Sequence, residues 1–225
     1  SRLEQMRENE GGLVTIGSSY TYSKYTLTDQ LIRFRMEYPN VRVQVQTVHS
    51  GQLFRQLLEG TVDVAFVRGD YEGAANRVLL GKNQAYAMTK EPIGNVEELE
   101  SMRRVWYSSN AESLNLLDDW WEDRFGIRPQ RGQVMGYVDV VWQMVQKGLG
   151  YTLCFLPEEY TNPYGLCLTP LVKRDGTPVT RNTWFLYPKN KRLNDNVDRF
   201  VEFVLRDRKR EIHERAGLED PDRPV

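Results

Sequence analysis

The stretch that decides the fold is "VRVQVQTVHSGQLFRQLLEGTVDVAFV", residues 41–67. Residues 41–48 alternate valine with polar side chains, which predicts a strand with one buried face. Ser50 then offers a helix N-cap, and Gly60 ends the predicted helix. The residues between them carry apolar side chains at helical spacing: Leu53, Phe54, Leu57 and Leu58. The continuous apolar run at 62–67 predicts a strand covered on both faces, as in a parallel α/β sheet.

The alternation of strands and helices extends in both directions from this stretch. Upstream, "GLVTIG" at 12–17 predicts a strand, and residues 27–38 predict a helix that Pro39 stops. Downstream, short strands are predicted at 103–107, 132–136 and 151–157. The helices predicted between them are one that contains Leu114, Leu117, Trp121 and Phe125 and ends at Gly126, and one at 138–148. Two β-α-β-α-β units in tandem predict two Rossmann-like α/β lobes, each with a mostly parallel sheet.

The remaining segments complete the predicted domain organisation. The segments 77–90 and 166–190 are expected to carry the chain between the lobes. A last helix at 194–205, capped by Asn194, is expected to pack on the first lobe, with the charged sequence after it frayed. We therefore expect the following boundaries: lobe I at 12–83 plus 183–212, lobe II at 84–182, and a C-terminal tail at 213–225. In the Trp120–Trp121 pair, Trp121 is expected in the core and Trp120 nearer the surface.

Composition excludes several classes of function. The net charge is −1, so the chain has no general electrostatic attraction to nucleic acid or to an anionic membrane. The longest apolar runs have the length of strands, which argues against a membrane span. Cys154 and Cys167 are too few for a disulfide framework, so the cytoplasm is the default compartment.

Two hydroxyl-rich patches follow predicted strands, "IGSSYTYSKYTL" at 16–27 and "YSSNAES" at 107–113. In parallel α/β sheets, ligands collect at the carboxyl ends of strands, beside helix N-termini that carry free N–H groups. The candidate ligand-binding residues in these patches are Ser18, Ser19, Thr21, Ser109, Asn110 and Ser113. For any single hydroxyl the alternative is a helix cap, but two matching patches favour a shared cleft between the lobes.

Signatures of catalysis and of metal binding are absent. The sequence contains no GxSxG, P-loop, GxGxxG or HExxH motif, so we expect no enzyme activity, no catalytic residue and no cofactor. His49 and His213 are the two histidines, which makes a zinc site improbable. His49 is a candidate for the cleft because it lies beside Ser50. Asp63, at the start of a buried strand, is expected to hydrogen-bond neighbouring backbone.

The order of these motifs resembles the effector-binding domain of LysR-type transcriptional regulators. The resemblance rests on Ile-Gly in the first strand, "YPNV", "SGQL", "LLEGTVDVAF" and "VQKGLGYTLCFLPEE", and it covers about residues 12–205. It implies a fold like that of type II periplasmic binding proteins, with a small polar or anionic inducer between the lobes. By the same resemblance, Thr21 and Ser50 hold the inducer. Lobe II would contribute these residues: Ser109, Asn110, Ser113, Tyr137 and Leu156.

The resemblance also implies partners. Residues 1–11 would be the end of a linker helix, and DNA would be contacted only through an N-terminal domain that is missing here. A homodimer or tetramer is expected, with the 23–38 helix of one copy against the 138–147 helix of another. The apolar side chains that suggest such an interface are Tyr22, Tyr25, Val141 and Trp142. The alternatives are a periplasmic solute-binding protein of a transporter and, on the same scaffold, a lyase or transferase.

Overall fold

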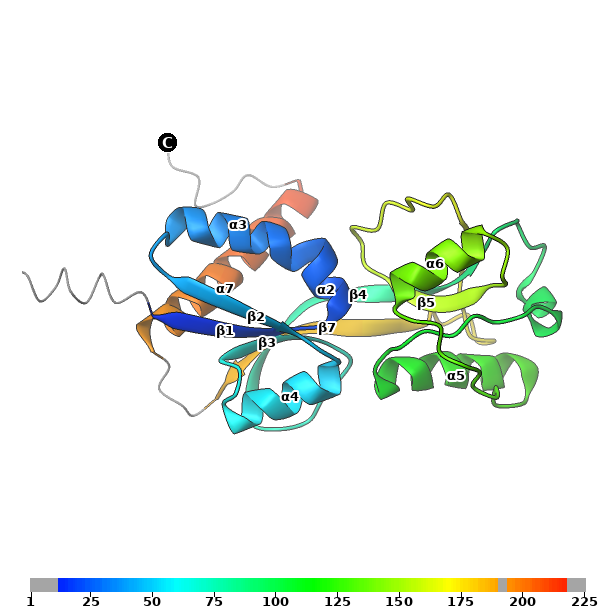
Figure 1. The fold of residues 1–225 in the computed structure, drawn as a ribbon, viewed down its shortest axis with the longest axis horizontal. Helices are drawn as coiled ribbons and strands as arrows, with labels where there is room; N and C mark the ends of the chain where they lie inside the picture. Colours follow the sequence, from blue (N-terminus) through cyan, green and yellow to red (C-terminus); the bar gives the residue numbers. More distant parts are fainter. Residues whose placement is uncertain (1–11, 190–193, 218–225) are drawn as a thin grey trace, which may run out of the picture.

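The computed structural model describes residues 12–189 and 194–217, so the expected linker helix at 1–11 lies outside the described residues. Two lobes lie end to end, and two long strands run between them (Figure 1). These strands are β4 (Ala75–Thr89) and β7 (Thr180–Pro188), which pair antiparallel. The prediction that two segments cross between the lobes is confirmed.

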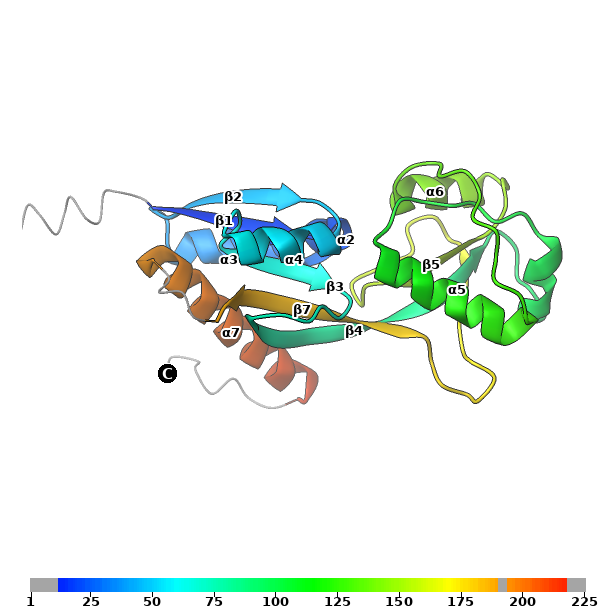
Figure 2. The ribbon, with the colours of Figure 1, turned by 90° about the horizontal axis from the view of Figure 1, so that it is seen from below.

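Lobe I is built from the stretch around residues 41–67 and its upstream neighbour. Its parallel strands are β1 (Leu13–Ser18), β2 (Arg42–Thr47) and β3 (Val64–Arg68), with β1 in the middle. Its helices are α2 (Tyr20–Tyr22), which continues through a π-helical turn at Ser23–Leu27 into α3 (Thr28–Glu37), then α4 (Ser50–Glu59) and α7 (Asp195–Arg215). Helices α3 and α7 cover one face of the sheet and α4 the other (Figures 1 and 2).

Lobe II is arranged around the other half of the crossing strands. Strands β5 (Thr152–Leu156) and β6 (Cys167–Pro170) pair antiparallel with β4. The helices are a 3₁₀ turn (Val96–Ser101), α5 (Ala111–Phe125) and α6 (Val138–Gln146), and α5 and α6 pack on opposite sides of β5 (Figure 1). The strands predicted at 103–107 and 132–136 shrink to parallel bridges, Arg104 with Tyr151 and Trp106 with Val134.

The expected α/β fold is confirmed, but its two lobes do not have separate sheets, and the sheet of lobe II is antiparallel rather than mostly parallel, because β4 pairs antiparallel with β5, β6 and β7. The strand order β2-β1-β3-β7-β4-β5, with β6 on β4, is one hydrogen-bonded path, because both lobes share β4 and β7. The cores are nevertheless distinct. Val14, Phe34 and Phe200 belong to a cluster of lobe I, whereas Trp120 and Leu153 belong to a cluster of lobe II. The hollow between these cores is where a ligand can lie.

Two helix boundaries differ from the prediction. The first helix begins at Tyr20 rather than at 27, so the hydroxyls at 21–26 lie on helical turns. Helix α7 continues ten residues past 205, into the sequence expected to fray. The reason is Asp207, which is buried and accepts hydrogen bonds from Arg33 (2.7 Å) and Arg210 (2.6 Å). A buried carboxylate with two guanidinium partners fixes this part of the helix against α3.

The prediction that Trp121 lies in the core is confirmed, but the prediction that Trp120 lies nearer the surface is wrong. Trp120 is fully buried, and its Nε1 donates to the Val172 carbonyl at 3.0 Å, while Trp121 keeps 9% of its surface exposed. Both rings face the lobe II core, because Phe125 packs against each of them. Helical spacing alone could not show that the Trp120 ring is buried next to the chain segment that contains Val172.

Candidate effector pocket between the lobes

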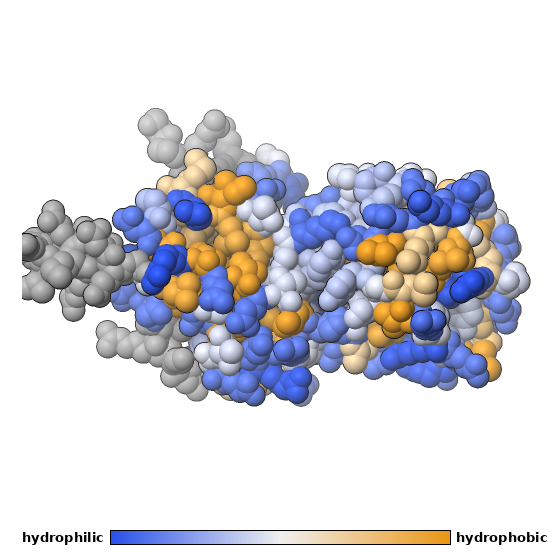
Figure 3. Space-filling view, viewed as in Figure 1, coloured by the Kyte–Doolittle hydropathy of each residue, from blue (hydrophilic) through white to orange (hydrophobic). Residues whose placement is uncertain are grey.

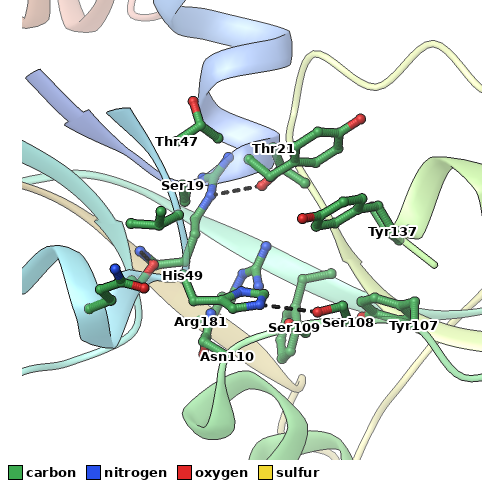
Figure 4. Close-up of a pocket in the computed structure, with 17 residues that line it drawn as sticks. Ser19, Thr21, Thr47, His49, Tyr107, Ser108, Ser109, Asn110, Tyr137 and Arg181 are labelled. Carbon is green, nitrogen blue, oxygen red and sulfur yellow. Dashed lines mark hydrogen bonds between the residues drawn. The ribbon is translucent and has the colours of Figure 1, made fainter. Parts of the chain in front are cut away.

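A cavity of about 190 Å³ opens between the two lobes. Lobe I supplies the start of α2, the β2–α4 loop and the end of β3, and lobe II supplies the segment before α5 and the start of α6 (Figure 4). The lining residues are Ser19, Tyr20, Thr21, Thr47, Val48, His49, Ser50, Gln52, Arg68, Tyr107, Ser108, Ser109, Asn110, Tyr137, Val138, Phe155 and Arg181. The N-termini of α4, α5 and α6 all reach this cavity, so free N–H groups of three helices border it.

Most residues predicted for a ligand site border this one cavity. They are Ser19, Thr21, His49, Ser50, Ser109, Asn110 and Tyr137. Three predicted residues are not part of the lining: Ser18, Ser113 and Leu156. The Ser18 hydroxyl is buried and donates to the Ser19 carbonyl, and Leu156 packs in a core cluster of lobe II. Ser113 is buried and does not line the cavity, but its hydroxyl accepts a hydrogen bond from Arg181 Nη1.

Ser50 is not the N-cap that the sequence predicted. The N-cap of α4 is His49, whose backbone is extended, and Ser50 is the first helical residue. The Ser50 hydroxyl instead accepts a hydrogen bond from the backbone N–H of Arg68 at 2.9 Å, with both groups buried. Ser50 therefore ties the start of α4 to the end of β3. Asn110, by contrast, is a true cap, because its side chain accepts from the Ser113 N–H at 2.8 Å.

Arg68 lies at the end of β3, and its guanidinium is buried among neutral partners. Its Nε donates to Thr21 Oγ1 at 3.3 Å (upper dashed line, Figure 4), and its Nη1 donates to Asn83 Oδ1 at 2.7 Å and to Thr183 Oγ1. Its Nη2 is buried without a partner among the described residues. Burial, and after it the charge of Arg181, lowers the pKa of Arg68 to about 9.

Arg181 is the second buried cation of the cavity. Its Nη1 donates to Ser113 Oγ at 2.8 Å, its guanidinium lies 4.7 Å from the centre of the Phe155 ring, and its Nε is buried with no partner in the described part of the chain. Burial lowers the pKa of Arg181 to about 10. Arginine nevertheless stays protonated in proteins, so these shifts express the cost of two poorly balanced positive charges.

Side chains of the two lobes meet around the cavity. On one flank, the Tyr20 hydroxyl donates to Asp139 at 2.9 Å, Lys24 pairs with the same carboxylate at 3.1 Å, and Tyr20 stacks on Tyr137 at 5.1 Å. On the other flank, the Tyr71 hydroxyl donates to Glu112 at 2.7 Å.

A hydrogen bond between His49 and Ser108, which both line the cavity, also links the two lobes. His49 Nε2 and Ser108 Oγ lie 3.1 Å apart (lower dashed line, Figure 4). Together with the contacts on the two flanks, this hydrogen bond links the two lobes.

The pKa of Asp139 depends on its contacts with Lys24 and Tyr20 of the other lobe. Burial alone would raise the pKa of Asp139, but hydrogen bonds from Lys24 and Tyr20, with the ammonium charge, lower it overall. The same carboxylate, together with burial, raises the pKa of Tyr20 to about 12. At neutral pH the flank therefore consists of a carboxylate, an ammonium and a neutral phenol.

Sequence reasoning missed the two arginines. Arg68 follows the apolar run of β3 directly, and Arg181 is the second residue of "TRNTWF" at 180–185. A charged residue at either place is usually solvated. The signal that was available is position, because Arg68 stands at the carboxyl end of a strand buried on both faces. Tyr20, Ser108 and Phe155 were also missed.

Comparison with known proteins defines the class. The model of the LysR substrate-binding domain matches residues 7–209, and the chain belongs to this family. An uncharacterized HTH-type transcriptional regulator of Bacillus subtilis, YraN, is 25% identical over 206 residues, which are 90% of this chain and 69% of that protein. A probable RuBisCO transcriptional regulator of Trichormus variabilis is 22% identical, over 90% of this chain and 64% of its own length. The chain thus spans about two thirds of these relatives.

Solved structures show the same fold. The effector-binding domain of QuiR in complex with shikimate has a TM-score of 0.72 at 14% identity, covering 89% of this chain and 99% of that one. The BenM effector-binding domain with its effector benzoate has a TM-score of 0.70 at 17% identity, covering 95% and 97%. The regulatory domain of Synechocystis CcmR in complex with 2-PG has a TM-score of 0.71 at 16% identity, covering 88% and 98%.

The described residues contain neither a candidate membrane span nor a candidate metal site. None of the helices within 12–189 and 194–217 is long and apolar enough to cross a membrane. The same residues hold no group of three or more His, Cys, Asp or Glu side chains that could bind a metal ion.

Proposed function

We propose that this chain is the sensing region of a LysR-type transcriptional regulator, and that it binds a small anionic effector in the pocket between its lobes. The observation that carries the proposal is the pair Arg68 and Arg181, because every hydrogen-bond partner that the described residues give either guanidinium is neutral. A buried ion without a counter-ion costs several kcal/mol. A ligand that brings negative charge recovers part of this cost on binding.

Other features of the pocket support an anion. The N-termini of α4, α5 and α6 border the cavity and favour negative charge. Hydroxyls such as Thr21 and Ser109 add hydrogen bonds without adding charge. Two of the solved relatives are named with benzoate or shikimate, which are both carboxylates. Each charge-assisted hydrogen bond contributes about 1.5–3 kcal/mol.

We propose that effector binding changes the lobe arrangement and thereby DNA binding by the full-length regulator. The curated relatives are named as transcriptional regulators, which favours this function over a transporter's solute-binding protein or an enzyme. DNA contacts would belong to a separate N-terminal domain. The place of action would be the cytoplasm, where the DNA is.

We further propose that the regulator works as an antiparallel homodimer, or a tetramer of such pairs. Exposed apolar side chains gather over α3 and β2 of lobe I and over α6 of lobe II, on one face of the molecule (Figure 3). They include Ile32, Met36, Val45 and Val140, of which Met36 is 80% exposed. The side chains that the sequence suggested do not form this patch. Tyr22, Val141 and Trp142 are buried within their own lobes, and Tyr25 packs against the lobe II cluster that contains Trp142. Sedimentation at micromolar concentration should show a dimer, and Met36→Glu should shift it toward monomer.

Thermal denaturation of the chain tests the sensing function. A panel of small carboxylates and phosphate esters would be compared with neutral and cationic metabolites of similar size, at constant ionic strength. An anion at 100 times its Kd should stabilise the chain by about 2.7 kcal/mol, and the gain should shrink in Arg181→Gln. Stabilisers that are only neutral or cationic, or an anion whose effect is unchanged in Arg181→Gln, would contradict the proposal.

A further inference from the structure

We infer that the effector carries two acidic groups, one for each buried arginine, and that it bridges the lobes through them. This inference rests on the proposed function and names the chemical class of its ligand. It starts from where each guanidinium is anchored. Arg68 is held by Thr21 of lobe I and by the crossing strands, whereas Arg181 is held by Ser113 of α5 and by Phe155 of β5, both in lobe II.

The two cations project from the same face of the sheet. Arg68 is the register partner of Thr183 on β7, and Arg181 lies two residues from Thr183, so both side chains project from the same face. Two residues along a strand span about 6.6 Å. The guanidiniums are anchored on different partners, Arg68 on Thr21 and Thr183 and Arg181 on Ser113, so a ligand with two acidic groups can give each cation its own counter-ion.

Each arginine also has an unused donor. Nη2 of Arg68 and Nε of Arg181 are buried and have no hydrogen-bond partner in the described residues. The nearby carboxylate that favours the Arg68 cation is Glu159, which acts from the opposite side, where a smaller cavity of about 40 Å³ lies between α7 and the crossing strands. Glu159 makes no ion pair with Arg68, and no carboxylate is among the groups that favour the Arg181 cation. Both arginines line the inter-lobe pocket.

The same geometry links charge to movement. Two like charges anchored in different lobes repel each other, and the charge of Arg181 lowers the pKa of Arg68. A ligand with an acidic group for each arginine removes this repulsion and draws the lobes together. A ligand with one acidic group leaves part of the repulsion in place. The cavity of about 190 Å³ has room for roughly six groups the size of water, which fits a short diacid.

Titration calorimetry with matched acids tests the inference. The probes are the straight dicarboxylates from malonate to adipate, the half-amide of each, and sulfate, all at constant ionic strength. A diacid and its half-amide have nearly the same shape and differ by one charge. We expect the best diacid to bind about tenfold to a hundredfold more tightly than its half-amide. Arg181→Gln should abolish this preference, and Arg181→Lys should keep most of it. Arg104→Gln, which removes a buried guanidinium outside the pocket, is the control and should preserve the preference.

The outcomes separate this inference from the function on which it rests. Equal affinity for a diacid and its half-amide, with both weakened in Arg181→Gln, would overturn the two-headed ligand and leave an anion sensor. Tighter binding of sulfate than of every diacid would also overturn it, because one doubly charged group would then serve both arginines. If no probe binds the parent chain below about 10 mM, the arginines form no anion site, and the proposed function fails with the inference.

Discussion

Replacing Ser50 with alanine should destabilise the chain because a buried backbone donor loses its acceptor. The Ser50 hydroxyl is fully buried and accepts from the Arg68 N–H at 2.9 Å. A buried donor left without a partner costs about 1–3 kcal/mol. For a chain of this size, each kcal/mol lowers Tm by roughly 2–4 °C. We therefore expect urea unfolding of Ser50→Ala to shift its midpoint at unchanged m-value, with a loss of about 1–3 kcal/mol.

A matched control, Ser108→Ala, tests whether removing any serine hydroxyl from the pocket has the same effect on stability. Ser108 also lines the pocket, but its hydroxyl bonds only the exposed His49 ring. Ser108→Ala should change stability by no more than about 0.5 kcal/mol. If Ser50→Ala is as stable as Ser108→Ala, the link between α4 and β3 contributes nothing, and our account of Ser50 is refuted.

Three further predictions concern the pocket and its frame. Thr21→Val removes the hydroxyl that accepts from Arg68 Nε, so it should weaken effector binding about tenfold, as measured by titration calorimetry. Trp120→Ala, which empties a fully buried site, should cost about 3–5 kcal/mol in urea unfolding, and a cost below 1 kcal/mol would contradict its burial. Because the pKa of Asp139 is lowered, its pairing with Lys24 stabilises the fold above the unfolded pKa and is lost as pH falls through the folded value. Asp139→Asn should therefore cost about 0.5 kcal/mol or less at pH 6, and the cost should shrink as the pH is lowered through the folded pKa, by urea unfolding.

The elements that periodicity predicted well are those whose sequence pattern matches their burial. The helix after residue 50 ends at Gly60, whose φ of 77° suits glycine, and the apolar run at 62–67 became the fully buried β3. The strands at 103–107 and 132–136 did not form as predicted. Each of these segments makes only isolated β-bridges, Arg104 with Tyr151 and Trp106 with Val134, and these are too few to form a paired strand.

Part of the pocket could be predicted because strand ends and helix starts determine where ligands collect. This rule singled out the two hydroxyl patches, the family resemblance singled out Thr21, Ser109 and Asn110 within them, and all three line the cavity. The arginines could not be found this way, because local sequence does not show that Arg181 is covered by Phe155 and Ser113. That burial depends on long-range pairing of β7 with β4.

A crystal structure of the chain with the acid that binds most tightly tests the central claim most directly. We predict that the ligand lies between the lobes, with one acidic group within hydrogen-bond distance of Arg68 Nη2 and another within that distance of Arg181 Nε. Both of these donors are buried without a hydrogen-bond partner in the described residues. A ligand bound elsewhere, or one in the pocket whose acidic groups contact neither guanidinium, would contradict the claim that the two arginines define the effector.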